Sequence, residues 1–322
     1  MNASSPVGFM FEIHSLNLFD AGALSEAVRS SRLEHLQVER GDFRAELKRI
    51  DLGRLTVDSG CYTRKVIARG DFPPGHVILG CVLDSREPGC INGYRFNRND
   101  VVIFPEGSEL DYIQPAFTSW CSIQLEKNVL EEAGCAEMTF DRVKVLPGNR
   151  SETARLVQIL GMLTECQAAA PHPGVAGSGH PSLPNEDIVL EQIRRTLSEH
   201  LGRRSLGRRA SLHNRMAMVR RFEQQVRERI NTVVRIPDLC AELGVSQRTL
   251  ETLFKTDIGM TPKQFATALR LNAVRRELLG TPAKNETVAK IAERYGINHL
   301  GRFPAYYQQQ FGELPSETPR GN

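Results

Sequence analysis

Four polar residues in the C-terminal part of the chain have a helix-like spacing and side chains that could bind a ligand. They are Gln247, Arg248, Glu251 and Thr252. Glutamine can make two parallel hydrogen bonds to adenine, and arginine can make two to guanine. Near the start of a helix, such side chains can reach base edges in the DNA major groove. The group therefore predicts readout of a duplex, if a helix presents these residues together. Two helices packed at a tight corner would leave the same side chains merely solvated.

The element that must position them lies in residues 239–254, which read LCAELGVSQRTLETLF. Gly244 permits a positive φ between two helices. Ser246 can cap the second helix, whose first amides otherwise lack partners. Leu250 and Phe254 are four residues apart and should face the core together, which leaves the polar residues outside. The stretch is typical of a helix-turn-helix, although short helical corners also occur in other proteins.

A weaker copy of this corner follows in the same chain. Leu239, Leu243, Gly244, Val245 and Ser246 align with Ile291, Tyr295, Gly296, Ile297 and Asn298 at an offset of 52. Beyond the corner the offset is 53, so the second unit has one extra residue. Such an internal repeat favours two helix-turn-helix units over a chance corner. The second group of candidate DNA-reading residues is His299, Leu300, Gly301 and Arg302.

Proline at position 304 falls within the expected second recognition helix. Inside a helix, proline removes a hydrogen bond and costs roughly 3 kcal/mol. The helix should therefore either start late, near Arg302, or be kinked. In both cases we expect the first unit to carry the larger share of sequence reading.

Between the two units, residues 262–279 have the apolar spacing of one long helix. This helix could hold the two recognition helices about one DNA turn apart, ~34 Å, so that a single chain reads two successive major grooves. Lys255, Lys263 and Gln264 are expected to contact phosphates, which position a protein on DNA without specifying sequence.

The charge distribution supports a polyanionic partner. The 322-residue chain is long enough for two domains and has an ordinary globular composition, with 40% hydrophobic and 25% charged residues. Residues 1–202 hold 20 basic and 27 acidic residues, a net charge of −7. Residues 203–322 hold 21 and 11, a net charge of +10. Because the basic region is also periodically apolar, it should fold and not remain a solvated tail.

The seven cysteines are odd in number and include no C-x-x-C pair, which favours reduced, mostly buried thiols. The chain has no run of ~18 consecutive apolar residues, so we expect no membrane span. The first residues, MNASSPVGFMFEIHS, lack the pattern of a secretion signal. We therefore expect a cytoplasmic protein.

The N-terminal half has a different periodicity. Residues 43–126 contain short apolar runs separated by Gly, Pro, Asn and Asp, which predict a small β-sandwich or barrel, and residues 8–37 could hold a short helix before it. The expected domains are a cupin-like sensor domain at 1–148, accessory helices at 149–202 with a mobile loop at 168–184, a linker at 203–214 and a DNA-binding domain at 215–322. The expected fold class is α+β multidomain, with an N-terminal cupin-like β-barrel and a C-terminal all-α domain.

The C-terminal stretches LCAELGVSQRTLETLFKTDIGMTPKQF, LRLNAVRRELL and VAKIAERYGINHLGRFPAYYQQQFGELPSETPR resemble the AraC/XylS family of transcription regulators over about residues 215–320. The resemblance implies two helix-turn-helix units that flank one long helix and bind double-stranded DNA. It also implies an N-terminal domain that senses a small-molecule effector or forms a homodimer, and activation through RNA polymerase. The stretch NRNDVVIFPEGSELDY more weakly resembles a strand pair of the cupin-like sensor domains.

Two other classes remain open from the sequence. One is a cupin-fold enzyme with a helical appendage, and the other is a ligand-binding or dimerising module without DNA binding. The cupin enzymes hold a metal with a His-x-His cluster and further ligands, whereas His76 has no such partners in its stretch PPGHVILG. No phosphate-binding glycine loop or nucleophile motif is evident. We expect no enzyme activity, no metal and no cofactor, and we interpret His76 as an ordinary loop residue.

Overall fold

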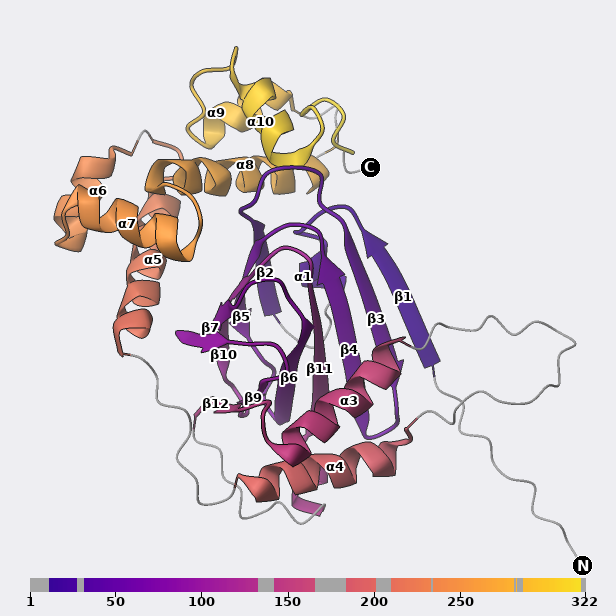
Figure 1. Ribbon diagram of the computed structural model, residues 1–322. Helices are drawn as coiled ribbons and strands as arrows, with labels where there is room; N and C mark the ends of the chain where they lie inside the picture. The colour runs from indigo at the N-terminus through magenta and orange to yellow at the C-terminus, as the bar shows by residue number, and fades with distance from the viewer. Residues whose placement is uncertain are drawn as a thin grey trace, which may run out of the picture.

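The computed structural model describes residues 12–27, 32–132, 142–165, 184–200, 210–232, 234–280, 282 and 286–319 (Figure 1). Strands dominate the N-terminal part, and helices α5 to α10 form the C-terminal part. None of the helices among these residues is long and apolar enough to cross a membrane.

The strands form two antiparallel sheets. The seven-stranded sheet has the order β1-β3-β4-β11-β6-β9-β12, and the five-stranded sheet has the order β2-β5-β10-β7-β8. The sheets are separate and do not close into a barrel, so that part of the expected fold was wrong. Their strands are β1 Glu12–Leu18, β2 Arg32–Gln37, β3 Ala45–Asp51, β4 Leu55–Tyr62, β5 Val66–Asp71, β6 His76–Asp84, β7 Gly89–Ile91, β8 Tyr94–Phe96, β9 Val101–Phe104, β10 Glu109–Gln114, β11 Thr118–Glu126 and β12 Lys144–Leu146.

The prediction for residues 8–37 also needs correction. In the described part of that range, β1 pairs with β3 and β2 pairs with β5, and the helix α1 spans only Leu24–Ala27. Sequence periodicity missed β1 because its described residues lie at a sheet edge, half-buried or exposed, so no inward face of apolar residues marks it.

The space between the two sheets is an apolar core. Inward-facing residues of the five-stranded sheet, such as Leu33, Phe96 and Leu110, meet residues of the other sheet, such as Ile78 and Phe104. Phe72 and Phe104 pack with ring centroids 5.0 Å apart. Side chains alternate along each strand, so every second residue enters this core and the others face outward.

The outer face of the seven-stranded sheet is covered by α3 (Ser151–Glu165) and α4 (Glu186–Glu199) (Figure 1). The apolar stripes of both helices, including Leu160 and Ile193, pack in one cluster with the strands of the same chain. The apolar stripes are therefore buried within this chain. The short helix α2 (Lys127–Leu130) follows β11. The expected mobile loop at 168–184 lies almost wholly outside the described residues.

The C-terminal part consists of α5 (Ala210–Glu228), α6 (Ile236–Leu243), α7 (Gln247–Asp257), α8 (Pro262–Gly280), α9 (Val288–Arg294) and α10 (Phe303–Phe311). Helix α5 begins inside the range expected to be a linker. Phe222, Phe254 and Phe265 bring α5, α7 and α8 together through ring pairs 4.8–6.3 Å apart. A second cluster joins α8 to α9 and α10.

The outer face of the five-stranded sheet packs against this helical part. Leu36, Ile67 and Ile113 share an apolar cluster with α5 residues such as Val219 and Phe222. Three acidic residues also form ion pairs in this region. Asp111 pairs with Arg69 and Arg220. Glu223 pairs with Arg69 and Arg227, and Glu34 pairs with Arg227 and Arg276. The two parts of the chain are therefore docked by both apolar and ionic contacts.

The end of β2 is also hydrogen bonded to the helical part. The Asn272 side-chain amide donates to the Gln37 carbonyl oxygen at 3.0 Å, and the Gln37 amide donates back to it at 3.2 Å. Gln310 of α10 donates to the same carbonyl oxygen at 3.0 Å. These contacts satisfy backbone groups that a sheet edge would otherwise leave unpaired.

Candidate nucleic-acid interface and buried cavity

The first corner joins α6 to α7 through residues 244–246. Gly244 ends α6 in the left-handed conformation at φ 69°, which a residue with a side chain rarely adopts. The side chain of Ser246 accepts a hydrogen bond from the Thr249 amide at 3.1 Å and caps α7. Leu250 and Phe254 are fully buried. The structure thus forms the corner as the sequence predicted, and it turns the polar face of α7 outward.

The four candidate residues lie together on this polar face. Gln247, Arg248 and Thr252 are exposed and Glu251 is half-buried. The Gln247 amide donates to Glu251 at 2.8 Å, and the Thr252 hydroxyl donates to the Arg248 carbonyl oxygen at 2.8 Å. No described residue forms an ion pair with the exposed Arg248 guanidinium, so its donors are available to a base edge.

The second corner joins α9 to α10 by a longer connection. Gly296 is left-handed at φ 71°, as Gly244 is. Residues 299–303 then form a turn in which the Phe303 amide donates to the His299 carbonyl oxygen at 3.1 Å. His299, Gly301 and Arg302 are exposed and Leu300 is half-buried. These candidates lie on the turn that precedes α10 and not on the helix.

Helix α10 starts at Phe303, so Pro304 falls in its first turn. The amides of the first turn have no partner within the helix, so proline costs little there and its fixed φ suits the position. Of the two expected alternatives, the late start is the one that forms. Pro304 therefore lies outside the helix interior, where proline would break a hydrogen bond.

The late start brings forward residues that sequence reasoning overlooked. Ala305, Tyr306, Gln308 and Gln309 are exposed on α10, and 44% of the Tyr306 side chain is accessible. The repeat offset of 53 was the available signal, because it places Ala305 opposite Thr252 and Gln308 opposite Lys255. At the position of Tyr306, the first unit has a buried residue, Leu253.

The helix α8 separates the two corners. Its 19 residues span about 28 Å at ~1.5 Å per residue, which approaches one DNA turn, ~34 Å. Lys255 on α7 and Lys263 at the start of α8 are exposed. Gln264 is engaged in a reciprocal cap, in which its side chain accepts from the Thr261 amide at 2.9 Å and its own amide donates to the Thr261 hydroxyl at 3.2 Å. Its first task is therefore to start α8.

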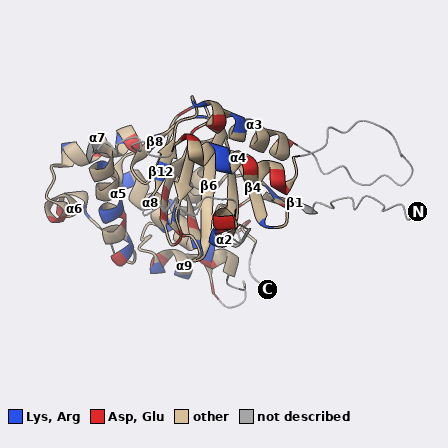
Figure 2. Cartoon of the chain, turned by 90° about the horizontal axis from the view of Figure 1, so that it is seen from below, with Lys and Arg blue, Asp and Glu red and all other residues tan. Residues whose placement is uncertain are grey.

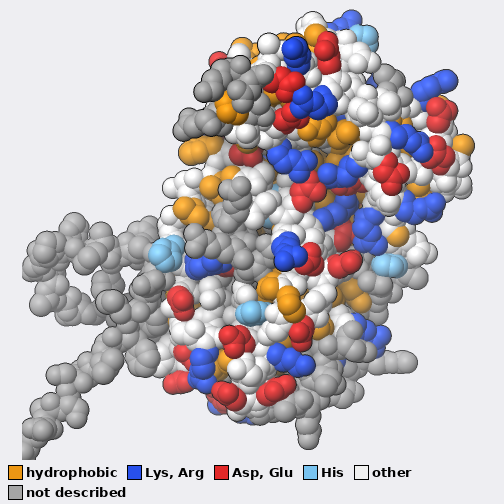
Figure 3. All heavy atoms as spheres, turned by 180° about the vertical axis from the view of Figure 1, so that it is seen from behind, with side chains coloured by type: hydrophobic (Ala, Val, Ile, Leu, Met, Phe, Trp, Pro, Cys, Tyr) orange, Lys and Arg blue, Asp and Glu red, His pale blue; other side chains and the backbone are white. Residues whose placement is uncertain are grey.

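The surface charge fits this arrangement. Basic and acidic residues both occur along α5 and α7 (Figure 2), and Lys and Arg side chains are numerous over the upper half of the molecule in Figure 3, with acidic side chains among them. Part of the positive charge is used within the chain, since Arg215 pairs with Asp257 and Arg294 pairs with Glu277. Residues 203–322 have a net charge of +10. Basic side chains that form no ion pair with a described residue, such as Arg248, are the ones that can bind a polyanion.

A buried cavity lies between the two sheets and encloses about 90 Å³. Its lining is mostly apolar and aromatic, with Leu110, Phe96 and Phe104 among its walls. His35 from β2 and Tyr112 from β10 also line it and are only 7% and 8% exposed. The His35 Nδ1 atom and the Tyr112 hydroxyl have no hydrogen-bond partner. Buried polar atoms are rarely left in this state, and each such case points to strain or to a missing ligand or water.

Burial lowers the pKa of His35 from 6.5 to about 4. The unfolded chain binds a proton as the pH falls below 6.5, while the folded protein keeps the ring neutral until about pH 4. Stability is therefore lost as the pH falls through this window, by about 2–3 kcal/mol at about pH 4.5. We expect His35→Phe to remove this share of the acid destabilisation in urea unfolding. His299→Gln, at an exposed site, is the control, and an unchanged pH dependence in His35→Phe would contradict the assignment.

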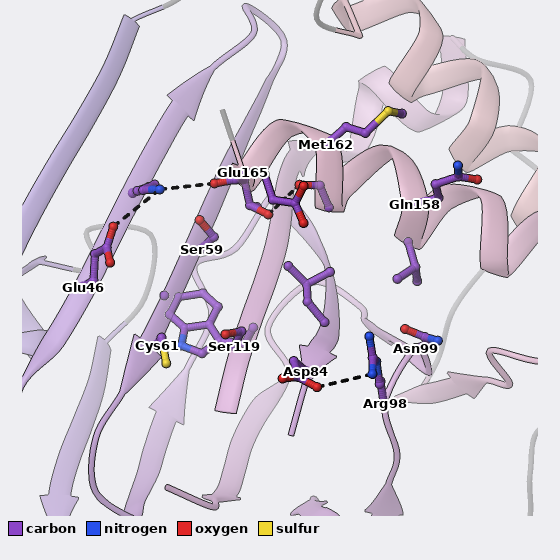
Figure 4. A pocket seen from close by; sticks show the side chains of 17 residues that line it. Glu46, Ser59, Cys61, Asp84, Arg98, Asn99, Ser119, Gln158, Met162 and Glu165 are labelled. Atoms are coloured by element: carbon purple, nitrogen blue, oxygen red, sulfur yellow. Dashed lines mark hydrogen bonds and ion pairs between the residues drawn. The ribbon is translucent and has the colours of Figure 1, made fainter. Parts of the chain in front are cut away.

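A more open hollow of about 680 Å³ lies between the seven-stranded sheet and α3 (Figure 4). Arg98 pairs with Asp84 at 3.4 Å, and Lys48 donates to the Thr164 carbonyl oxygen at 3.3 Å, so both of its basic side chains already have partners. Across the described ranges, His, Cys, Asp and Glu side chains form no group of three that could hold a metal ion. His76 opens β6, and its Nδ1 lies 3.1 Å from the Pro74 carbonyl oxygen.

The C-terminal part of the chain is similar in sequence to known proteins. A helix-turn-helix domain family matches residues 239–321. The probable thc operon regulatory protein of Rhodococcus erythropolis is 36% identical over 85 residues, which are 26% of each chain. The XylDLEGF operon transcriptional activator of Pseudomonas putida is 35% identical over 100 residues, which are 31% of each chain. The crystal structure of the AraC-like activator CuxR covers 80% of this chain and 94% of its own, with 14% identity and a TM-score of 0.40.

The corner geometry and the domain match show that residues 239–321 form a helix-turn-helix domain. Through this domain the chain is similar to transcription regulators of the AraC/XylS type. The match spans about a quarter to a third of the length of these two relatives. The similarity therefore concerns the C-terminal domain.

Proposed function

We propose that this chain is a sequence-specific activator of transcription that reads two successive major grooves of double-stranded DNA. The observation that carries the proposal is the pair of corners at opposite ends of α8. Each has a left-handed glycine, Gly244 or Gly296, a buried apolar side and an exposed side with polar residues. The length of α8, about 28 Å, suits two recognition helices that enter neighbouring grooves on one face of the duplex.

The two corners contribute unequally in this proposal. Gln247, Arg248, Glu251 and Thr252 read bases in the first groove from the start of an unbroken helix. In the second groove, His299, Gly301 and Arg302 approach from the turn before α10, with Leu300 anchoring that turn, and the exposed face of α10 completes the contact. Lys255 and Lys263 bind phosphates, and Gln264 adds a phosphate contact while it caps α8.

In this proposal the N-terminal domain regulates DNA binding. The effect of a small-molecule effector in the buried cavity would be transmitted to the DNA-binding domain through the docked five-stranded sheet. The Pseudomonas putida relative is a transcriptional activator, and activation by this chain would require a contact with RNA polymerase. A homodimer would need a surface other than the apolar stripes of α3 and α4, which are buried on their own sheet.

Selection of bound sites from random duplex DNA tests the proposal. We expect a site with two motifs about 10 base pairs apart centre to centre, and binding that weakens steeply with salt. The first motif should be the more strictly defined. A site with one short motif would reject the second reading unit, and binding that ignores sequence would reject the function.

A further inference from the structure

The five-stranded sheet is a wall between two environments. On β2, Leu33 and His35 face the buried cavity, while Glu34 and Leu36 between and beyond them face the helical domain. The alternation of side chains along a strand enforces this division. A change in the position of β2 would therefore alter both the cavity and the contact with the helical domain.

Strand β10, which lies on the other side of β5 from β2, repeats the pattern. Leu110 and Tyr112 line the cavity, whereas Asp111 binds Arg220 of α5 and Ile113 joins the apolar cluster with that helix. Arg69 of β5, which lies between β2 and β10, faces outward to Glu223 and Asp111. The residues that hold the DNA-binding domain are thus the immediate chain neighbours of the residues that line the cavity.

The cavity lining also restricts what it can hold. Its described walls offer apolar and aromatic surface, with no Lys, Arg, Asp or Glu side chain to balance a charge. Burying an unpaired charge there would be very costly, whereas an uncharged molecule avoids that cost. The His35 Nδ1 atom and the Tyr112 hydroxyl need hydrogen-bond partners, and one polar group on an otherwise apolar ligand would supply them. At about 90 Å³, the space is a few times the share of one water molecule in the liquid, ~30 Å³.

We propose that this cavity binds an uncharged, largely apolar small molecule that hydrogen bonds to His35 and Tyr112, and that β2 and β10 transmit its presence to α5 and α8 through Glu34 and Asp111. The proposal rests on the effector control proposed above and assigns its ligand class and its route. An occupied cavity stiffens the wall strands, and the ionic contacts on their opposite face pass this stiffening to the DNA-binding domain.

Amide hydrogen exchange on the full chain tests both parts, with phenol as the probe. We expect millimolar phenol to slow exchange in β2 and β10 and also in α5. Toluene, which lacks the hydroxyl, should act more weakly, and benzoate, which is charged, should leave exchange unchanged. Tyr112→Phe should bind phenol about fivefold more weakly, because one hydrogen bond is lost. The same variant should melt about 2–4 °C higher without ligand, because it no longer buries an unpaired hydroxyl.

Transmission is tested by the double variant Arg220→Gln with Arg227→Gln, which removes the contacts of α5 to Asp111 and Glu34 and leaves the cavity lining intact. Phenol should still slow exchange in β2 and β10, but the slowing in α5 should be lost. Arg221→Gln is the matched control, since Arg221 is exposed on the same helix, and it should retain both effects.

Three results would overturn the inference: no effect of phenol on β2 and β10, stronger binding of benzoate than of phenol, or unchanged slowing of α5 in the double variant. Hydrogen exchange does not require DNA. A failure here is therefore distinct from a failure of the proposed function, which would appear as loss of sequence-dependent DNA binding.

Discussion

Arg248→Ala is expected to weaken binding to the selected DNA site by about 1–3 kcal/mol and to relax the preference at one base position. The guanidinium lies exposed near the start of α7, the α-helix that follows the capped corner, and no described residue forms an ion pair with it. It can therefore make two hydrogen bonds to a guanine edge, which a methyl group cannot replace. The effect should be seen in titrations of the selected site and of variants changed at single positions.

Two further variants separate base reading from general charge. Lys263→Ala should weaken binding to all sequences about equally and reduce the salt dependence by about one counterion, as expected for a phosphate contact. Arg221→Ala, which removes an exposed charge from α5, should have a much smaller effect. If Arg248→Ala lost affinity equally on every sequence, Arg248 would be a phosphate contact.

Glu223→Gln is expected to destabilise the folded chain by about 3 kcal/mol. Glu223 is 4% exposed and lies between Arg69 of the sheet and Arg227 of its own helix, with the Arg227 contact at 2.8 Å. Burial lowers the pKa of Arg69, and the negative charge of Asp111 partly offsets this effect. Removal of one partner leaves a buried positive charge less compensated, which is among the more costly changes in a protein interior.

Urea unfolding of the full chain measures this loss. The matched control is Glu228→Gln on the same helix, where the exposed carboxylate accepts from Gln224 at 2.9 Å. That change should shift stability by less than about 0.5 kcal/mol. Equal losses of unfolding free energy in the two variants would show that the ion pairs of Glu223 stabilise the fold no more than an exposed contact does. A loss in Glu223→Gln without any change in DNA affinity would show that docking and DNA reading are independent.

The C-terminal domain could be predicted in detail because its signals are local. The boundaries of α7 and the start of α8 follow from a serine cap, glycines and proline that act within a few residues of themselves. The corner at Gly244 and the buried pair of Leu250 and Phe254 are similarly encoded in consecutive residues. The second unit was harder, because whether Pro304 lies in the first turn or in the interior depends on how residues 299–303 wrap.

The N-terminal domain was predicted only as a class. Short apolar runs indicate strands, yet they do not state which strands pair, so two sheets and one closed barrel have similar sequence patterns. The strand β1 was missed because it pairs at an edge with β3, and β2 was missed because its cavity-facing residues include a histidine. Nothing local to His35 or Tyr112 distinguishes them from other half-apolar strand residues.

The sequence by itself therefore determined the helical domain: its two corners, the long helix between them and its positive charge. Each rests on spacing of a few residues or on composition, and none needs a distant partner. Only the tertiary structure decided that the helical domain is docked on a five-stranded sheet whose other face lines a cavity. That arrangement joins Glu34 to Arg276 and Asp111 to Arg220 across more than a hundred residues of chain, and such contacts exist only once strand pairing has brought them together.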